Sequence, residues 1–104
     1  MSGYEFHPEA RANLDEIWEF IRASNLDAAD RVIAEILAAV RTLVPFPYAG
    51  HRRPELTGQP MRFKRVRDYL IAYAPDEKRL WVIAVLHGHR SSRTVAAILR
   101  GREN

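Results

Sequence analysis

The chain has 104 residues, of which 47% are hydrophobic, so it can bury one core and is expected to form a single domain over residues 1–104. It has no cysteine, which excludes disulfides and cysteine-ligated zinc, and no run of the roughly 20 apolar residues that a membrane span needs. No apolar run typical of a signal peptide follows Met1. We therefore expect a cytoplasmic protein with no membrane partner.

The charge of the chain is unevenly distributed. The formal net charge is +3, but residues 1–44 hold eight acidic and four basic side chains, whereas residues 51–104 hold five acidic and twelve basic ones. Fourteen of the sixteen basic residues are Arg, whose planar guanidinium suits carboxylates and phosphates. A coding preference for Arg would explain that count but not the segregation. The segregation indicates an anionic partner that faces the C-terminal half.

The first elements are predicted to be a short strand and two helices. Residues 4–7 alternate apolar and polar side chains, as a strand does, and Pro8 suits the first position of a helix that ends near Ala23. Asn25 or Asp27 is expected to cap a second helix with a wide apolar face. So short a connection predicts an antiparallel helical hairpin, and the width of the second apolar face predicts that it also covers a sheet.

A long connection rich in Pro and Gly follows the second helix. It spans residues 45–59, and its prolines end the helix because they cannot continue it. Ordered loops of this length are uncommon unless they pack on something or perform a function. We interpret Phe46 and Tyr48 as packing anchors of this loop, and Arg52 and Arg53 as solvated side chains.

The rest of the chain is predicted to form three strands and a short helix. The strands are expected over residues 61–66, 69–73 and 80–86, and a helix capped by a preceding serine over residues 94–100. The strand over residues 80–86 is nearly all apolar, which is typical of a central strand covered on both faces. The order β-α-α-β-β-β with a C-terminal helix predicts an α+β fold, in which the hairpin packs on a small curved antiparallel sheet.

Four aromatic side chains on these elements are interpreted as parts of the core. Trp18 and Trp81 stand at positions that follow the apolar periodicity, as core side chains do. Tyr69 and Tyr73 share one face of their strand, because side chains two and four residues apart point the same way. We expect these tyrosines to shield the core with their hydroxyls directed outward.

Short motifs follow one another in a fixed order along residues 4–93. Each motif is weak alone, and their order and spacing carry the information. The motifs are Phe6-His7-Pro8-Glu9-Ala10, Ala28-Ala29, Leu43 with Pro47-x-x-Gly50, Glu55-Leu56, Gly58 followed by Arg62, Tyr69-x-x-x-Tyr73, and Val85-Leu86-His87-Gly88-His89-Arg90. With this order and spacing the chain resembles the ParE/RelE superfamily of type II toxins, and it is closer to ParE than to RelE.

The resemblance implies a growth-inhibiting bacterial toxin with the α+β fold described above and no cofactor. It also implies a cognate, ParD-like antitoxin, encoded alongside, that binds the toxin directly in a toxin–antitoxin hetero-oligomer. Two activities occur in the superfamily. ParE-like members poison DNA gyrase and are not enzymes, whereas RelE-like members are ribosome-dependent endoribonucleases that cut mRNA.

The residues that distinguish these two activities favour ParE. RelE-like nucleases have an Arg after the first Tyr of the Tyr-x-x-x-Tyr strand and an aromatic residue near the C-terminus, where this chain has Leu70 and Ala96. RNA cleavage needs cationic groups and a group that moves the 2′-OH proton, so these departures predict a gyrase-binding toxin that is not an enzyme. The alternatives are a ribosome-dependent mRNA endoribonuclease and a divergent member that keeps only antitoxin binding.

Candidate site residues follow from the resemblance and from the basic C-terminal half. A gyrase-binding toxin needs no catalytic residue of its own. For the nuclease alternative, the catalytic candidates are Arg62, His87, His89 and Arg90. Binding of the target or the antitoxin is assigned to Arg62, Arg65, Arg67, His89, Arg90 and Arg93.

Some of these assignments have a second interpretation. Arg62 matches a position where the superfamily nearly always has Arg, so a structural ion pair is as good an interpretation as a functional role. His87 and His89 alternate and therefore share one face, where a His can act as acid or base near neutral pH or can satisfy backbone groups at a strand end. Two imidazoles without a third ligand are too few for zinc, so we expect no metal site.

Overall fold

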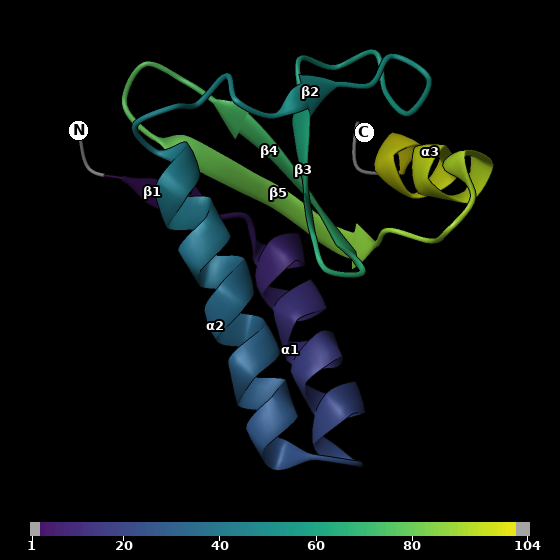
Figure 1. Cartoon of the computed structure of the whole chain (residues 1–104). Helices are drawn as coiled ribbons and strands as arrows, with labels where there is room; N and C mark the ends of the chain where they lie inside the picture. The colour runs from purple at the N-terminus through teal and green to yellow at the C-terminus, as the bar shows by residue number, and fades with distance from the viewer. Residues whose placement is uncertain (1–2, 102–104) are drawn as a thin grey trace.

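The computed structural model describes residues 3–101, and residues 1–2 and 102–104 of the expected domain lie outside the described residues. One five-stranded sheet separates the helical hairpin from a short third helix (Figure 1), which confirms the α+β class. In chain order the elements are β1 (Tyr4–Phe6), α1 (Pro8–Arg22), α2 (Leu26–Leu43), β2 (His51–Arg52), β3 (Arg62–Val66), β4 (Tyr69–Pro75), β5 (Leu80–His87) and α3 (Ser92–Arg100).

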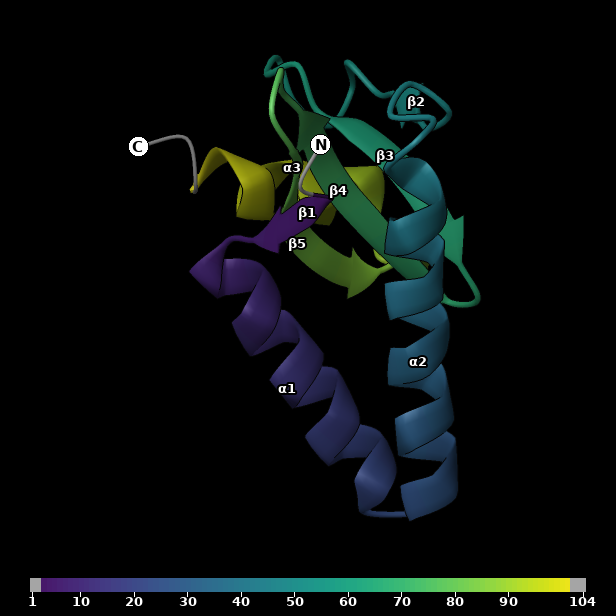
Figure 2. The same cartoon turned by 90° about the vertical axis from the view of Figure 1, so that its left-hand side faces the viewer.

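The helical hairpin begins and turns at the residues that cap its helices. Pro8 occupies the first turn of α1, and the His7 side chain accepts a hydrogen bond from a backbone N–H of that turn. Asn25, and not Asp27, caps α2 by accepting a hydrogen bond from the Ala28 N–H at 3.0 Å. The two helices contact each other and meet at their connection, away from the sheet (Figure 1), and they separate towards the sheet (Figure 2). Among residues 3–101, no helix combines the length and apolar content needed to cross a membrane.

The strand order in the sheet is β1-β5-β4-β3-β2. The three pairs from β2 to β5 are antiparallel, as expected, but β1 runs parallel to β5, with Tyr4 opposite Leu80. The sheet is therefore mixed, and the expectation of an antiparallel sheet needs this correction. Parallel neighbours need a long connection, and here everything from α1 to β4 lies between the two strands. Alternating side chains give no information about strand direction.

A second difference lies inside the segment that the sequence presents as a loop. His51 and Arg52 form the two-residue edge strand β2, paired with Phe63 and Arg62 of β3. Both β2 residues are exposed, so the pattern of buried and polar side chains that predicts a strand is missing. Only the pairing with β3 makes this segment a strand.

The two faces of the sheet bury two separate hydrophobic clusters. Ile71 and Val82 belong to the cluster under the hairpin, together with residues of α1 and α2 such as Ile36. Ala72 and Leu86 belong to the cluster under α3. Strands β4 and β5 both contribute to the two clusters, so the prediction that residues 80–86 form a strand covered on both faces is confirmed.

The two tryptophans are not core residues, which corrects the expectation. Each is only partly buried, and each indole N–H donates to a surface carboxylate: Trp18 to Asp30 at 2.8 Å and Trp81 to Asp76 at 2.9 Å. An indole carries one donor, which makes the rim of a core favourable because the ring packs there while the N–H finds an acceptor. Apolar periodicity does not detect that partner.

The aromatic residues of the long loop also differ from the expectation. Phe46 and Tyr48 are 68% and 69% exposed, so they are not packing anchors. The loop is held instead by Tyr73, which is fully buried and whose hydroxyl accepts a hydrogen bond from the Gly50 N–H at 2.8 Å. Tyr69 and Tyr73 do lie in the same cluster under the hairpin, but the hydroxyl of Tyr73 is directed into the protein.

Candidate functional site

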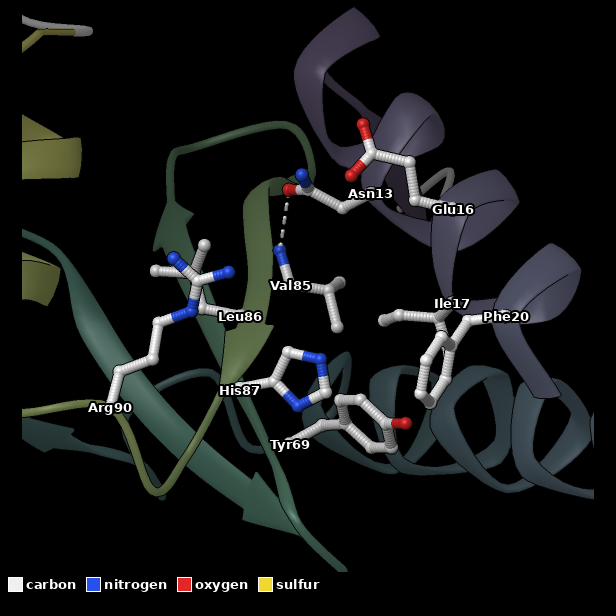
Figure 3. A pocket seen from close by; sticks show the side chains of 9 residues that line it. All are labelled: Asn13, Glu16, Ile17, Phe20, Tyr69, Val85, Leu86, His87 and Arg90. Atoms are coloured by element: carbon white, nitrogen blue, oxygen red, sulfur yellow. Dashed lines mark hydrogen bonds between the residues drawn. The ribbon is translucent and has the colours of Figure 1, made fainter.

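A pocket of about 240 Å³ lies between α1 and the C-terminal end of β5 (Figure 3). Strand β1 is short and reaches only as far as Val82 along β5, so the following part of β5 lacks a strand neighbour on that side. Asn13 of α1 takes the place of this missing strand partner by accepting a hydrogen bond from the Val85 N–H at 3.0 Å. The pocket opens beside this contact and is lined by Asn13, Glu16, Ile17, Phe20, Tyr69, Val85, Leu86, His87 and Arg90.

His87 ends β5 and lines the pocket. Its ring centroid lies 5.1 Å from the ring of Tyr69 and 5.1 Å from the ring of His89, so the two histidines do meet, as their alternation predicts. The Nδ1 atom of His87 is buried and has no hydrogen-bond partner within residues 3–101. It therefore does not satisfy a backbone group at the strand end.

The surroundings of His87 keep its imidazole neutral. Burial lowers the pKa of His87, and the positive charges of His89 and Arg90 lower it further, whereas Asp68 opposes them. At neutral pH the ring is therefore uncharged, with one buried nitrogen that the chain leaves unpaired. Such a group can accept or donate a hydrogen bond to a bound partner.

Free cations lie next to this pocket. Arg90 lines the pocket from the segment after β5, and Arg93 follows in the first turn of α3. The side chains of both arginines are exposed. Within the part of the chain that the structure describes, neither guanidinium takes part in an ion pair. Glu16 of α1 also lines the pocket, beside the apolar side chain of Phe20.

The other three candidate arginines are engaged in contacts within the protein. Arg62 donates from Nη1 to the Gly50 carbonyl at 2.8 Å, and Arg65 donates from Nη2 to the Gly88 carbonyl at 3.0 Å. Arg67 forms an ion pair with Glu35 of α2 at 2.6 Å, and this hydrogen-bonded guanidinium lowers the pKa of the Glu35 carboxyl. Each of the three thus fastens one segment to another.

Arg62 therefore has a structural role, but not the ion pair that the sequence suggested. Its partners are backbone carbonyls, of Gly50 and also of Tyr48 at 3.3 Å, and its guanidinium lies 5.0 Å from the centre of the Tyr48 ring. A guanidinium has five donors, so it can bridge several carbonyls of one turn. Sequence identifies Arg62 as important but does not reveal these partners, because they are separated from it by 12 and 14 residues.

The structure does not assemble the four residues of the nuclease alternative. His87, His89 and Arg90 lie together, but Arg62 is opposite Tyr73 on β4, whereas His87 is opposite Tyr69. Four residues along a strand separate the two positions by about 13 Å.

The two positions where RelE-like nucleases have functional side chains are also buried in this protein. Leu70 is 5% exposed and Ala96 is 8% exposed, and Leu70 packs in the cluster under α3. A side chain at either position would have to reach substrate through the packed interface between α3 and the sheet. The departures found in the sequence thus coincide with buried positions.

Sequence analysis missed the residues that α1 contributes to the pocket. Asn13, Glu16 and Phe20 lie off the main apolar stripe of α1 and gave no motif. Phe20 is 75% exposed, but a single exposed apolar side chain is normal on a protein surface, so it gave no signal in the sequence. Within the described residues, no group of three or more His, Cys, Asp or Glu side chains has the arrangement of a metal site.

Known proteins share this chain's sequence pattern and fold. The family model described as "ParE toxin of type II toxin-antitoxin system, parDE" matches residues 4–92. A protein named "Putative toxin Y4kP", from Sinorhizobium fredii (strain NBRC 101917 / NGR234), is 31% identical over 87 residues, which cover 78% of this chain and 82% of that protein. These matches define the chain as a toxin of a type II toxin–antitoxin system.

The fold agrees with a solved structure. The chain is similar to a chain of the "Chromosomal ParDE TA system from P. aeruginosa", with a TM-score of 0.69 and 18% identity over 84% of this chain and 95% of that one. The chain belongs to the ParE toxin family, as the order of its motifs predicted.

Proposed function

We propose that this ParE-family toxin inhibits bacterial growth by binding DNA gyrase in the cytoplasm, without catalysing a reaction itself. The observation that carries the proposal is the position of the arginines: Arg62, Arg65 and Arg67 each contact another segment of the chain, and Arg62 lies about 13 Å along the sheet from His87. A phosphodiester cannot contact all the nuclease candidates at once. A binding surface, in contrast, needs only exposed groups.

We also propose that a ParD-like antitoxin neutralises the toxin by binding across the His87 pocket in a hetero-oligomer. The pocket combines an apolar floor, which includes Ile17 and Val85, with the free cation of Arg90. Interfaces concentrate their binding energy where an apolar anchor fills such a pocket and charges surround it. An acidic amphipathic segment would match both properties, because its carboxylates would meet Arg90 and Arg93.

Parallel assays of DNA and RNA test the proposed target. Purified toxin is expected to inhibit supercoiling by gyrase and to trap cleaved DNA, while mRNA on translating ribosomes stays intact. New mRNA ends at the ribosomal A site, with normal supercoiling, would show that the endoribonuclease alternative is correct. His87 is the observation in favour of that second candidate, because its neutral ring beside His89 and Arg90 suits proton transfer.

Induction of the toxin without antitoxin tests whether it is toxic at all. We expect growth to stop, and co-expression of the antitoxin to restore it. Normal growth of cells that hold the folded toxin, together with tight antitoxin binding, would instead identify a member that keeps only antitoxin binding.

A further inference from the structure

The loop after α2 exposes two aromatic rings at the end of the sheet opposite the His87 pocket. Phe46 and Tyr48 are 68% and 69% exposed. A hollow of about 450 Å³ is lined only by this loop's own residues, Pro45 to Ala49. The loop lies at the C-terminal end of α2, far from the tip of the hairpin (Figure 1 and Figure 2). Exposed apolar groups gathered in this way are typical of a binding surface.

The loop is held in one shape by the protein beneath it. The Phe46 N–H donates to the Leu43 carbonyl at 3.1 Å, and the Ala49 N–H donates to the Phe46 carbonyl at 3.0 Å. Gly50, which ends the loop, is held from both sides by the Tyr73 hydroxyl and the Arg62 guanidinium. The two prolines of the loop further restrict the backbone. The backbone that carries the rings is thus held in place before binding, which reduces the conformational entropy that binding would cost.

The chain segment that contains the loop carries a net positive charge. No carboxylate occurs between Glu35 and Glu55, whereas four basic or imidazole side chains do: Arg41, His51, Arg52 and Arg53. Glu35 and Glu55 are themselves ion-paired, with Arg67 and Arg53. Arg41 and Arg52 are exposed and form no ion pair within residues 3–101. In the sequence, the loop therefore lies between two cations that form no ion pair within residues 3–101.

We propose that residues 41–52 bind single-stranded nucleic acid, with Phe46 and Tyr48 stacked on unpaired bases and Arg41 and Arg52 in contact with phosphates. Exposed aromatic rings flanked by cations are how proteins bind single strands, because every base has a π-face and every nucleotide a negative charge. Arg62, 5.0 Å from the centre of the Tyr48 ring, already interacts with that ring as a cation. Paired bases hide their faces, so a duplex cannot use the rings.

The same contacts indicate that this surface distinguishes neither one base from another nor RNA from DNA. Several backbone groups of the loop are hydrogen-bonded within the protein and so do not face a base: the N–H groups of Phe46, Ala49 and Gly50 and the carbonyl of Tyr48. Apart from the Tyr48 hydroxyl, the side chains of the hollow have no polar atom. Binding is therefore expected to depend little on base sequence, and little on whether the sugar carries a 2′-OH.

Fluorescence anisotropy with the full chain tests the proposal. The probes are labelled 12-nucleotide oligo(dT), oligo(U) and a 12-base-pair duplex. We expect the two single strands to bind within about threefold of each other and the duplex to bind at least about fivefold more weakly. Two phosphate contacts predict a log–log salt slope of about −1.4, which falls to about −0.7 in Arg41→Gln.

Substitution of the rings separates stacking from charge. Phe46→Ala and Tyr48→Ala are each expected to weaken binding of oligo(dT) by at least about fivefold. Phe20→Ala is the matched control, because Phe20 is as exposed but lies on α1 beside the other pocket, and it should leave the affinity unchanged. All three rings are exposed, so the variants are expected to keep the wild-type melting temperature.

The proposal is wrong if Phe46→Ala and Tyr48→Ala bind oligo(dT) as the wild type does, or if the duplex binds as tightly as the single strands. It is also wrong if these variants lose affinity for purified gyrase while the wild type does not bind oligonucleotides, because the loop is then a protein-docking surface. The oligonucleotide assays contain no gyrase, so they are independent of the proposed gyrase target. Failure of that target would leave their result unchanged.

Discussion

The two ends of the β4–β5 hairpin differ in whether their buried polar groups are hydrogen-bonded within the chain. At the Gly50 end, the Gly50 N–H and carbonyl are both satisfied, by Tyr73 and Arg62. At the other end, Nδ1 of His87 is buried without a partner in the described chain, and the adjacent Arg90 is unpaired. Buried polar groups are nearly always hydrogen-bonded in native proteins. We infer that the buried polar groups at the Gly50 end are satisfied by the fold itself, whereas the buried nitrogen at the His87 end is left for the binding partner proposed above.

The largest effect is expected from filling the space at Gly50. A Cβ at this position would lie 2.5 Å from the Tyr73 hydroxyl oxygen and 2.8 Å from the Phe63 carbonyl oxygen, which belongs to the backbone of β3. We expect Gly50→Ala to lower the free energy of unfolding by about 2–4 kcal/mol, because overpacking here displaces a strand. Urea denaturation measures the loss. Gly58→Ala is the control, since nothing lies within 4 Å of its Cβ, and an equal loss there would contradict the steric explanation.

Removal of one hydroxyl at the same end should have the next largest effect. Tyr73→Phe leaves the buried Gly50 N–H without its acceptor, and an unsatisfied buried donor costs about 1–3 kcal/mol. Tyr69→Phe is a fitting control, because the Tyr69 hydroxyl has no hydrogen bond within residues 3–101. Thermal and urea unfolding of both variants give the comparison. If the two variants lose the same stability, the Gly50 end is not specifically dependent on this bond.

At the His87 end, a charge reversal should change binding more than stability. We expect Arg90→Glu to weaken antitoxin binding by about tenfold, with Arg93→Glu acting in the same direction, since both remove a cation that an acidic segment would contact. Lys78→Glu, in the turn at the far end of β5, makes the same change of charge away from the pocket. Calorimetric titration with the antitoxin measures the difference. Unchanged affinity and unchanged toxicity of both arginine variants would remove these residues from the interface.

The smallest effect is the pH dependence that His87 adds. Because burial and the nearby charges of His89 and Arg90 lower the pKa of His87, the unfolded chain takes up its proton near pH 6.5, before the folded chain does. Stability should therefore fall as the pH drops from about 7 towards 5, and His87→Gln should reduce that fall. Urea denaturation across this range measures it, and an NMR titration of the ring gives the pKa directly. An identical slope in the variant would show that other groups cause the dependence.

Local features of the sequence predicted much of the fold. The hairpin, the three longer strands and α3 follow from capping residues, prolines and the spacing of apolar side chains, all of which act within about four residues. The ParE family was also evident from the order of short motifs. The prediction that the chain is not a nuclease rests on Leu70 and Ala96, because a missing functional group is visible in sequence without knowledge of the fold.

The roles of individual arginines could not be predicted from local features of the sequence. Arg62, Arg65 and Arg67 belong to one basic segment, but their partners lie 12, 23 and 32 residues away and are two carbonyls and a carboxylate. Any of these arginines would be an equally good candidate for a partner contact until its internal partner is known. All three are candidates for partner contact from the sequence, as Arg90 is, but Arg90 alone of the four lines the pocket.

The sequence by itself therefore determined the helices and the strands other than β2, the family and the segregation of charge. The tertiary structure decided that β1 runs parallel to β5, that Trp18 and Trp81 face surface carboxylates, and that the His87 pocket takes one wall from α1. The physical reason is the range of the interactions. Propensity and capping act between neighbours, whereas strand pairing, hydrogen bonding and pocket formation join groups, such as Asn13 and Val85, that are 72 residues apart.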